Sequence, residues 1–265
     1  MLRRKLKQTT RDAASNVKDT TGRTRMASTR GLTVSARRKT DERSKRVRPS
    51  GRTTLQQEQK QDTRKRLLSA AAAAFAERSY AATSVEDIIR LAAVGRTSFY
   101  RHFDSKWSIA SALCEQVMPQ VWNLWQELAG IGDPSATDIA NWLSRRVKLY
   151  HEHSAMFAVM KEAVAIEPEA MAAVTRTHDE VINVLAAGIP AFSLALGGTA
   201  ISGEVKIRAC LLLMQLDEFN YFLAVRGWDV DHKLATRLMA EQIRKFIDDV
   251  GALKVVATRK RPARD

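Results

Sequence analysis

The chain has 265 residues, with 43 Lys and Arg against 29 Asp and Glu, and a net charge of +14. Its 45% of hydrophobic residues can form a packed core, which excludes a wholly disordered chain. The only cysteines are Cys114 and Cys210, which are too few for a disulfide framework or a zinc cluster. A reducing cytoplasm is therefore the expected location.

The positive charge is concentrated at the N-terminus. Residues 1–60 hold 18 basic and 5 acidic side chains and no aromatic residue, whereas residues 61–265 hold 25 and 24. Such a segment buries too little surface to fold, so residues 1–60 are expected to be a disordered basic tail. Its Arg- and Ser-rich start also resembles an organelle transit peptide, and a translation start at Met26 or later is a further alternative. Residues 253–265 are expected to form a second basic tail.

From residue 62 onward the apolar spacing is helical. The first helix is expected over 62–78. Thr83 is expected to cap the second helix, with Glu86 completing a capping box, and a very short third helix should carry residues 96–101. A fourth helix should start near Ser105 and continue through Pro119 to residue 128, because its apolar stripe keeps its phase. The proline predicts a kink in one bent helix.

The remaining chain also predicts helices. Asp133 and Pro134 resemble an N-cap followed by proline at the first helical position. Further helices are expected over 154–165, 168–187, 204–225 and 231–250. Between Glu180 and Glu204 lie 23 uncharged residues, but their glycines and proline argue against a membrane span and favour a helix end and a loop. With no alternating strand pattern, the predicted fold class is all-α.

The penultimate helix predicts self-association. Residues 209–216 are apolar on every side except at Gln215, so this helix must be covered all round. A homodimer formed through the two C-terminal helices would provide that cover. A fully buried core helix in a monomer is the alternative.

Residues 83–103 have the size and spacing of a helix-turn-helix unit. The polar side of its second helix offers Arg96, Thr97, Ser98 and Arg101 to a DNA groove, and Phe99 and Phe103 can anchor the opposite side. Tyr100, His102 and Lys106 surround it with donors for phosphate oxygens.

The run T-S-V-E-D-I-I-R-L-A-A-V-G-R-T-S-F-Y-R-H-F-D-S-K resembles the DNA-binding motif of the TetR/AcrR family of bacterial transcriptional regulators, and with the first helix the resemblance covers 62–113. It implies an all-helical homodimer with an N-terminal three-helix DNA-binding domain and a ligand-binding and dimerisation domain. By matching position, Arg96, Thr97 and Ser98 face base edges. The phosphate contacts fall to Tyr100, His102 and Lys106, with help from Ser84. Ser79, Ala93 and Gly95 depart from the family's usual Gly, Gly and Ser.

The expected division is 61–110 for the DNA-binding domain and 111–252 for the ligand-binding and dimerisation domain. The run M-Q-L-D-E-F-N-Y-F in the latter is similar to ethionamide-type regulators of actinobacteria. A pocket for a small apolar ligand is expected there. Its candidate residues are Trp122, Trp125, Trp142, Tyr150, Phe157, Met160, Met214, Gln215 and Phe219. The bent fourth helix is the expected lever between ligand and DNA.

The predicted function is a ligand-released repressor that binds a palindromic operator in double-stranded DNA, although activation is compatible with the same sequence. A nonspecific, nucleoid-type DNA-binding protein driven by the basic tail is the alternative. An enzyme is not expected, because His151 and His153 point to opposite sides of a helix and no nucleophile motif occurs. Asp217 and Glu218 are expected to be solvated or to form an intersubunit salt bridge. No metal site, cofactor or membrane contact is predicted.

Overall fold

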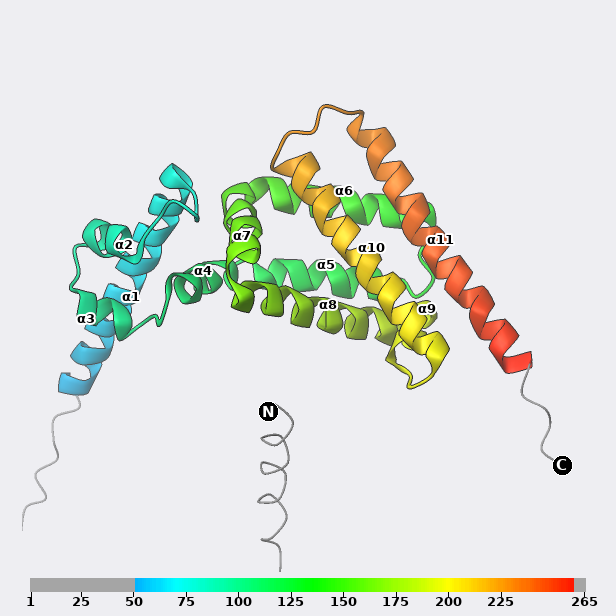
Figure 1. Cartoon of the computed structure of the whole chain (residues 1–265), viewed down its shortest axis with the longest axis horizontal. Coiled ribbons are helices and arrows are strands. Elements are labelled where there is room, and N and C mark those ends of the chain that lie inside the picture. The colour runs from blue at the N-terminus through cyan, green and yellow to red at the C-terminus, as the bar shows by residue number, and fades with distance from the viewer. Residues whose placement is uncertain (1–50, 260–265) are drawn as a thin grey trace, which may run out of the picture. The chain divides into compact units, whose positions relative to one another are not determined.

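The computed structural model describes residues 51–259, and the expectations for residues 1–50 and 260–265 lie outside that range. Contacts divide the chain into two units, and the second, residues 49–265, contains all the described residues. Every described element is a helix, and no strand occurs in the described part of the chain. The predicted all-α fold class is confirmed (Figure 1).

The first four helices form an N-terminal head. They are α1 (Gly51–Arg78), α2 (Val85–Ala92), α3 (Arg96–Tyr100) and α4 (Lys106–Cys114). Their apolar sides share one core that includes the fully buried Leu67, Tyr80, Ile88, Phe99 and Ile109. The head is therefore held together by side chains from all four helices and from the α1–α2 turn.

The following helices form the C-terminal body around a second core. They are α5 (Met118–Gly130), α6 (Ala136–Glu152), α7 (Ser154–Ile166), α8 (Pro168–Gly188), α9 (Pro190–Ser193), the 3-10 helix η1 (Leu194–Leu196), α10 (Ala200–Ala224) and α11 (His232–Arg259). The uncharged stretch after Glu180 thus completes α8 and then forms two short helices. None of the described helices has the length and apolar character needed to cross a bilayer.

The predicted end of the basic tail was placed too far along the chain. Helix α1 begins at Gly51, so residues 51–60 continue the helix that was expected to start near Asp62. Thr54, Gln56, Gln57, Glu58 and Gln59 lack the apolar periodicity used to recognise a helix, yet they add turns to a helix that is anchored further along by its core residues.

The caps of α2 and α6 each lie beyond the predicted residue. Ser84, not Thr83, caps α2, and its side chain and Asp87 form the capping box. Thr83 is buried, and its hydroxyl donates to the carbonyl oxygen of Ser79 at 2.6 Å, so it cannot cap the helix. At α6 the cap is Ser135, with Asp138 as its partner, in place of the predicted Asp133.

The fourth predicted helix is two helices. Cys114 ends α4, and α5 begins at Met118 with Pro119 in its first turn. Between them the backbone N–H groups of Gln116 and Val117 donate to carbonyls three residues earlier, which tightens the turn. The prediction of a kink was wrong because Pro119 lies in the first turn of α5, where a missing N–H costs nothing.

Replacing Ser84 by Ala should lower the free energy of unfolding by about 1 kcal/mol, because the first turn of α2 loses its side-chain acceptor. Urea unfolding followed by circular dichroism measures the change. Ser144→Ala is the matched control, since Ser144 lies on the exposed side of α6 and bonds only to the carbonyl of Ala140. Equal stability of Ser84→Ala and the wild type would contradict the assigned cap.

Candidate nucleic-acid interface

Helix α3 is held from one side and presents the other to solvent. Phe99 is fully buried, and its ring centroid lies 6.0 Å from that of Phe103. Arg96, Thr97, Tyr100 and Arg101, all exposed, line a shallow hollow on the surface. Burying the aromatic side therefore leaves a cationic and hydroxyl-bearing surface available for a partner.

Arg96 is positioned by two weak interactions. Its Nη1 lies 3.0 Å from Oε1 of Glu86 on α2, and its guanidinium lies 5.6 Å from the ring centroid of Tyr100. Both members of the ion pair are well exposed, so the pair contributes little to stability. Arg96 can consequently exchange Glu86 for a base edge or a phosphate at small cost.

The structure places two cations of α1, Lys60 and Arg64, near His102, and the sequence analysis missed both. His102 is half-buried, and its pKa is lowered by burial and by the charges of Lys60, Arg101 and Arg64. Lys60 and Arg64 lie one turn apart on α1, so α1 contributes positive charge beside the end of α3. Their four-residue spacing was a readable signal. The predicted domain boundary at residue 61 assigned Lys60 to the tail and Arg64 to the DNA-binding domain, so the pair was not recognised.

The other residues predicted to contact DNA differ in exposure and in whether they already have a hydrogen-bond partner. Ser98 is half-buried. Ser84 is exposed, but its hydroxyl is engaged in the α2 cap. Lys106 is half-buried, and its Nζ donates to the carbonyl oxygen of Tyr80 at 2.9 Å and lies 4.2 Å from the centroid of that ring. Lys106 thus ties α4 to the α1–α2 turn.

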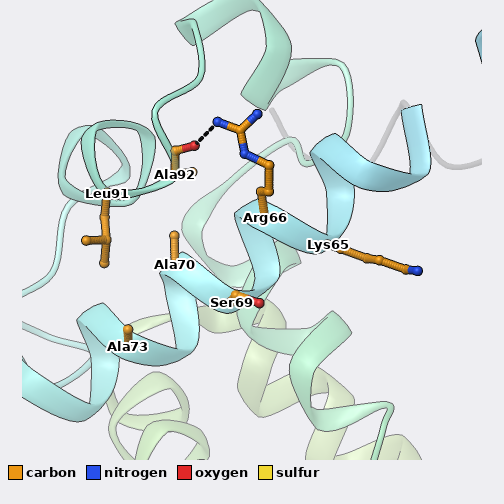
Figure 2. Close-up of a pocket in the computed structure, with 7 residues that line it drawn as sticks. All are labelled: Lys65, Arg66, Ser69, Ala70, Ala73, Leu91 and Ala92. Atoms are coloured by element: carbon orange, nitrogen blue, oxygen red, sulfur yellow. Dashed lines mark hydrogen bonds between the residues drawn. The ribbon is translucent and has the colours of Figure 1, made fainter. Parts of the chain in front are cut away.

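The turn that precedes α3 is fixed to α1 (Figure 2). Ala93 has a φ of 50°, a left-handed conformation that normally favours glycine. Arg66 donates from Nη2 to the carbonyl oxygens of Ala92 at 2.6 Å and Ala93 at 2.9 Å. This charged donor satisfies carbonyls at the end of α2 and helps to hold a turn whose left-handed position carries alanine in place of glycine.

The predicted pocket residues of the body differ in burial. Trp125, Trp142 and Tyr150 are buried. The half-buried members are Trp122, Phe157, Met160 and Phe219. Met214 and Gln215 are exposed on α10, and Gln215 exchanges hydrogen bonds with Gln242 of α11.

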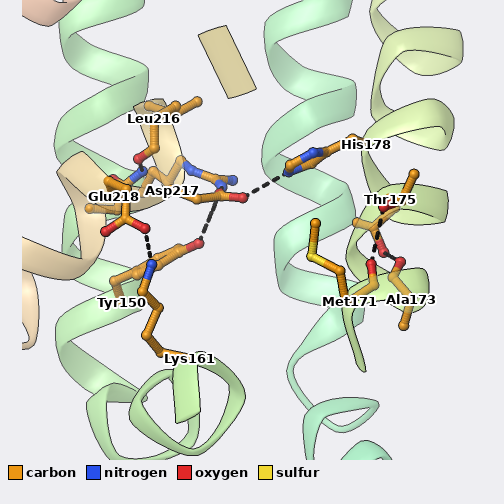
Figure 3. A network of polar contacts seen from close by, with 12 residues as sticks. Tyr150, Lys161, Met171, Ala173, Thr175, His178, Leu216, Asp217 and Glu218 are labelled. Carbon is orange, nitrogen blue, oxygen red and sulfur yellow. Dashed lines mark hydrogen bonds and ion pairs between the residues drawn. The ribbon is translucent and has the colours of Figure 1, made fainter. Parts of the chain in front are cut away.

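Asp217 forms a cluster of polar contacts with Tyr150 and His178 (Figure 3). The Arg146 side chain is only 3% exposed, and its Nη2 donates to Oδ1 of Asp217 at 2.9 Å. His178 Nε2 lies 2.9 Å from the other carboxylate oxygen. The guanidinium lies 4.5 Å from the Trp125 ring centroid, while its Nε and Nη1 are buried without a hydrogen-bond partner among the described residues. Asp217 therefore pairs with two side chains of its own chain, while its side chain stays 40% exposed.

This cluster makes the body sensitive to acid. Burial alone would raise the pKa of Asp217, but the His178 hydrogen bond and the charge of Arg146 hold it below the ordinary value. A lowered pKa in the folded state contributes stability above the ordinary value near pH 4, and that contribution is lost as the pH falls through the lowered one.

Asp217→Asn should therefore lower the free energy of unfolding at pH 7, by about 1 kcal/mol because the carboxylate is 40% exposed and solvent screens the pair, and flatten its dependence on pH below about 4. Thermal unfolding measured from pH 2.5 to pH 7 tests both effects. Asp179→Asn, which breaks the exposed pair with Lys206, is the control. A slope below pH 4 that matches the wild type would contradict the assigned coupling.

The cations on α1 should set part of the salt dependence of DNA binding. Replacing both Lys60 and Arg64 by Ala should reduce the slope of log K against log salt by about 2, since each lost phosphate contact removes about 0.9. Lys206→Ala with Arg208→Ala, on the body, should leave the slope unchanged. Fluorescence anisotropy with a labelled duplex measures it, and an unaltered slope in the α1 pair would show that α1 does not contact phosphate.

Comparison with known proteins gives the site a family. Residues 67–113 match the family described as bacterial regulatory proteins, tetR family, which spans α1 from Leu67 through α4. No curated protein matches the sequence. In the described range, no three His, Cys, Asp or Glu side chains are grouped as metal ligands.

One solved structure agrees with the fold, and a second is less similar to this chain. A putative TetR-family transcriptional regulator from Syntrophomonas wolfei is 16% identical, with a TM-score of 0.50 over 72% of this chain and 96% of that one. A TetR-like transcriptional regulator from Rhodococcus sp. RHA1 is also 16% identical, with a TM-score of 0.46 and coverage of 72% and 96%. The resemblance seen in residues 83–106 is confirmed: the chain carries the N-terminal domain of the tetR family of bacterial regulatory proteins, on an all-helical fold similar to that of TetR-family regulators.

Proposed function

We propose that this protein is a ligand-responsive transcriptional repressor that binds a palindromic operator as a homodimer. The observation that carries the proposal is the exposed side of α3, where Arg96, Thr97 and Arg101 lie opposite the buried Phe99. A short rigid helix with such a surface is suited to reading base edges in a major groove.

The roles divide by position. Arg96, Thr97 and Ser98 are assigned to base edges, and Tyr100, Arg101 and His102 to phosphates, together with the two α1 cations Lys60 and Arg64. Because Lys106 and Ser84 already have partners within the head, we assign them to holding α4 and α2 in place, with any phosphate contact secondary.

An exposed apolar face on α10 and α11 supports the homodimer. Ile207 is 63% exposed and Leu211 60%, and Met214 continues the same stripe at helical spacing. On α11, Leu234 and Leu238 are also exposed, one turn apart. The Gln215–Gln242 hydrogen bonds join the two helices. An apolar surface of this extent is typical of a protein interface, and two copies of this face can cover each other.

Regulation requires a ligand that distinguishes two states of the body. The aromatic residues around Arg146 are the candidate site, because aromatic walls and buried polar groups are the usual components of a ligand pocket. Helix α4 belongs to the head core and also contacts α7, so it remains the proposed lever. The lever now ends at Cys114, before the break that precedes α5.

Replacing Leu211 by Glu should convert a dimer into a monomer, because two carboxylates would be buried against an apolar face. Analytical ultracentrifugation at micromolar concentration measures the change. Leu91→Glu is a matched control, since Leu91 is 54% exposed but lies on α2. A monomeric wild-type protein would contradict the proposed assembly.

Genome-wide recovery of DNA bound in the native cell tests the function. A regulator should return a few palindromic fragments, and the purified protein should prefer them over random duplex by roughly a thousandfold at physiological salt. Recovery of DNA without sequence preference, together with competition by random duplex at equal concentration, would favour the nonspecific DNA-binding protein instead.

A further inference from the structure

Two glutamates of the body hold the α1–α2 turn of the head. The hydroxyl of Tyr80 donates to Oε1 of Glu167 at 2.8 Å, and the backbone N–H of Ala81 donates to Oε2 of Glu162 at 2.9 Å. Glu162 lies in the last turns of α7, and Glu167 is the N-cap residue of α8. We call Tyr80, Ala81, Glu162 and Glu167 the clasp.

Apolar packing surrounds the clasp on the same side. Val159 and Ala163 of α7, and Ala170 of α8, belong to the head core together with Phe75 and Tyr80. The ring centroids of Phe75 and Tyr80 are 5.3 Å apart. The α7–α8 corner therefore covers one side of the head core. The two carboxylates fix the position of that corner relative to the α1–α2 turn.

Tyr80 is a dependable donor in this arrangement. Its side chain is fully buried, and that burial, together with the Glu167 carboxylate, raises its pKa far above the ordinary value. The phenol consequently stays protonated across the pH range of DNA-binding assays. A hydrogen bond to a charged acceptor is stronger than a neutral one.

The residue next to Glu162 faces the rest of the body. Lys161 forms an ion pair with Glu218 of α10, as Figure 3 shows, and its Nζ lies 5.6 Å from the ring centroid of Tyr221. Glu218 directly follows Asp217, the carboxylate bound by Arg146 and His178. Lys161 and Glu162, which are consecutive in α7, thus contact α10 and the head, respectively.

We propose that Glu162 and Glu167 are positioning residues, which hold the head at a fixed orientation to the body. This second attachment is separate from the covalent one through α4. The proposal rests on the proposed function, because a fixed head orientation matters for DNA only if two heads must meet two operator arms at once.

The test compares Glu162→Ala/Glu167→Ala with Glu162→Gln/Glu167→Gln, in which the amide oxygen can still accept both hydrogen bonds. Glu152→Ala, which breaks a surface pair on α6, is the control. The first readout is hydrogen exchange of the Ala81 amide in the free protein. The alanine pair should accelerate it about tenfold or more, corresponding to loss of one charge-assisted hydrogen bond. The glutamine pair, which keeps a neutral acceptor, should accelerate it less, and the control should not change it.

The second readout is binding to a recovered palindromic fragment and to the same fragment with one arm scrambled. The alanine pair should weaken two-arm binding by about tenfold and leave one-arm binding unchanged, because each head stays folded. Unchanged Ala81 exchange overturns the clasp, and an equal loss on both fragments overturns the positioning role. If the wild type binds both fragments equally, the proposed function fails while the exchange result still decides the clasp.

Discussion

A helix of five residues cannot maintain itself, and the candidate interface depends on one such helix. Isolated helices shorter than about 12 residues are marginal in water, so α3 exists because Phe99 is buried in the head core. Core burial on one side fixes which residues face outward on the other. The cationic surface formed by Arg96, Thr97 and Arg101 is thus a consequence of where the aromatic side chains are packed.

The same constraint explains why several polar contacts hold the turns of the head around α3. Arg66 holds the left-handed turn at Ala93. Lys106 and the clasp carboxylates hold the α1–α2 turn, through the carbonyl of Tyr80, its hydroxyl and the N–H of Ala81. None of these polar contacts reads DNA. Each restricts the position of a helix too short to be rigid alone, and so converts a flexible peptide into a surface of defined shape.

Much of the fold was predictable because helical periodicity is strong in this chain. The third helix and the helices over 154–165, 168–187 and 204–225 were located to within a few residues. The last helix was predicted over 231–250 but continues to Arg259, so the part of the expected C-terminal tail that is described, residues 253–259, is helical. The caps were not, since Thr83 and Ser84 both carry a hydroxyl with a carboxylate three residues later, and only burial decides between them. Pro119 posed the same difficulty, because the apolar phase is unchanged whether a helix bends or restarts there.

The charged cluster in the body could not be predicted from helical periodicity. Arg146 and Asp217 are 71 residues apart, and His178 is 39 residues from Asp217, so no local pattern joins them. Arg146 lies one turn from both Trp142 and Tyr150 on the buried side of α6, against three aromatic rings, but its spacing does not identify the carboxylate that pairs with it. The outward face of α3 was easier to predict, because one buried aromatic residue, Phe99, lies among polar residues in a single short helix.

The central claim is that α3 reads base edges in duplex DNA twice, once from each copy of a dimer. Quantitative footprinting of a recovered palindromic fragment, with the wild type and with Thr97→Ala, tests it most directly. Protection should cover two arms on one face of the duplex, about one or two helical turns apart, and Thr97→Ala should weaken both arms equally. Protection of a single arm, or a footprint indifferent to Thr97, would contradict the claim.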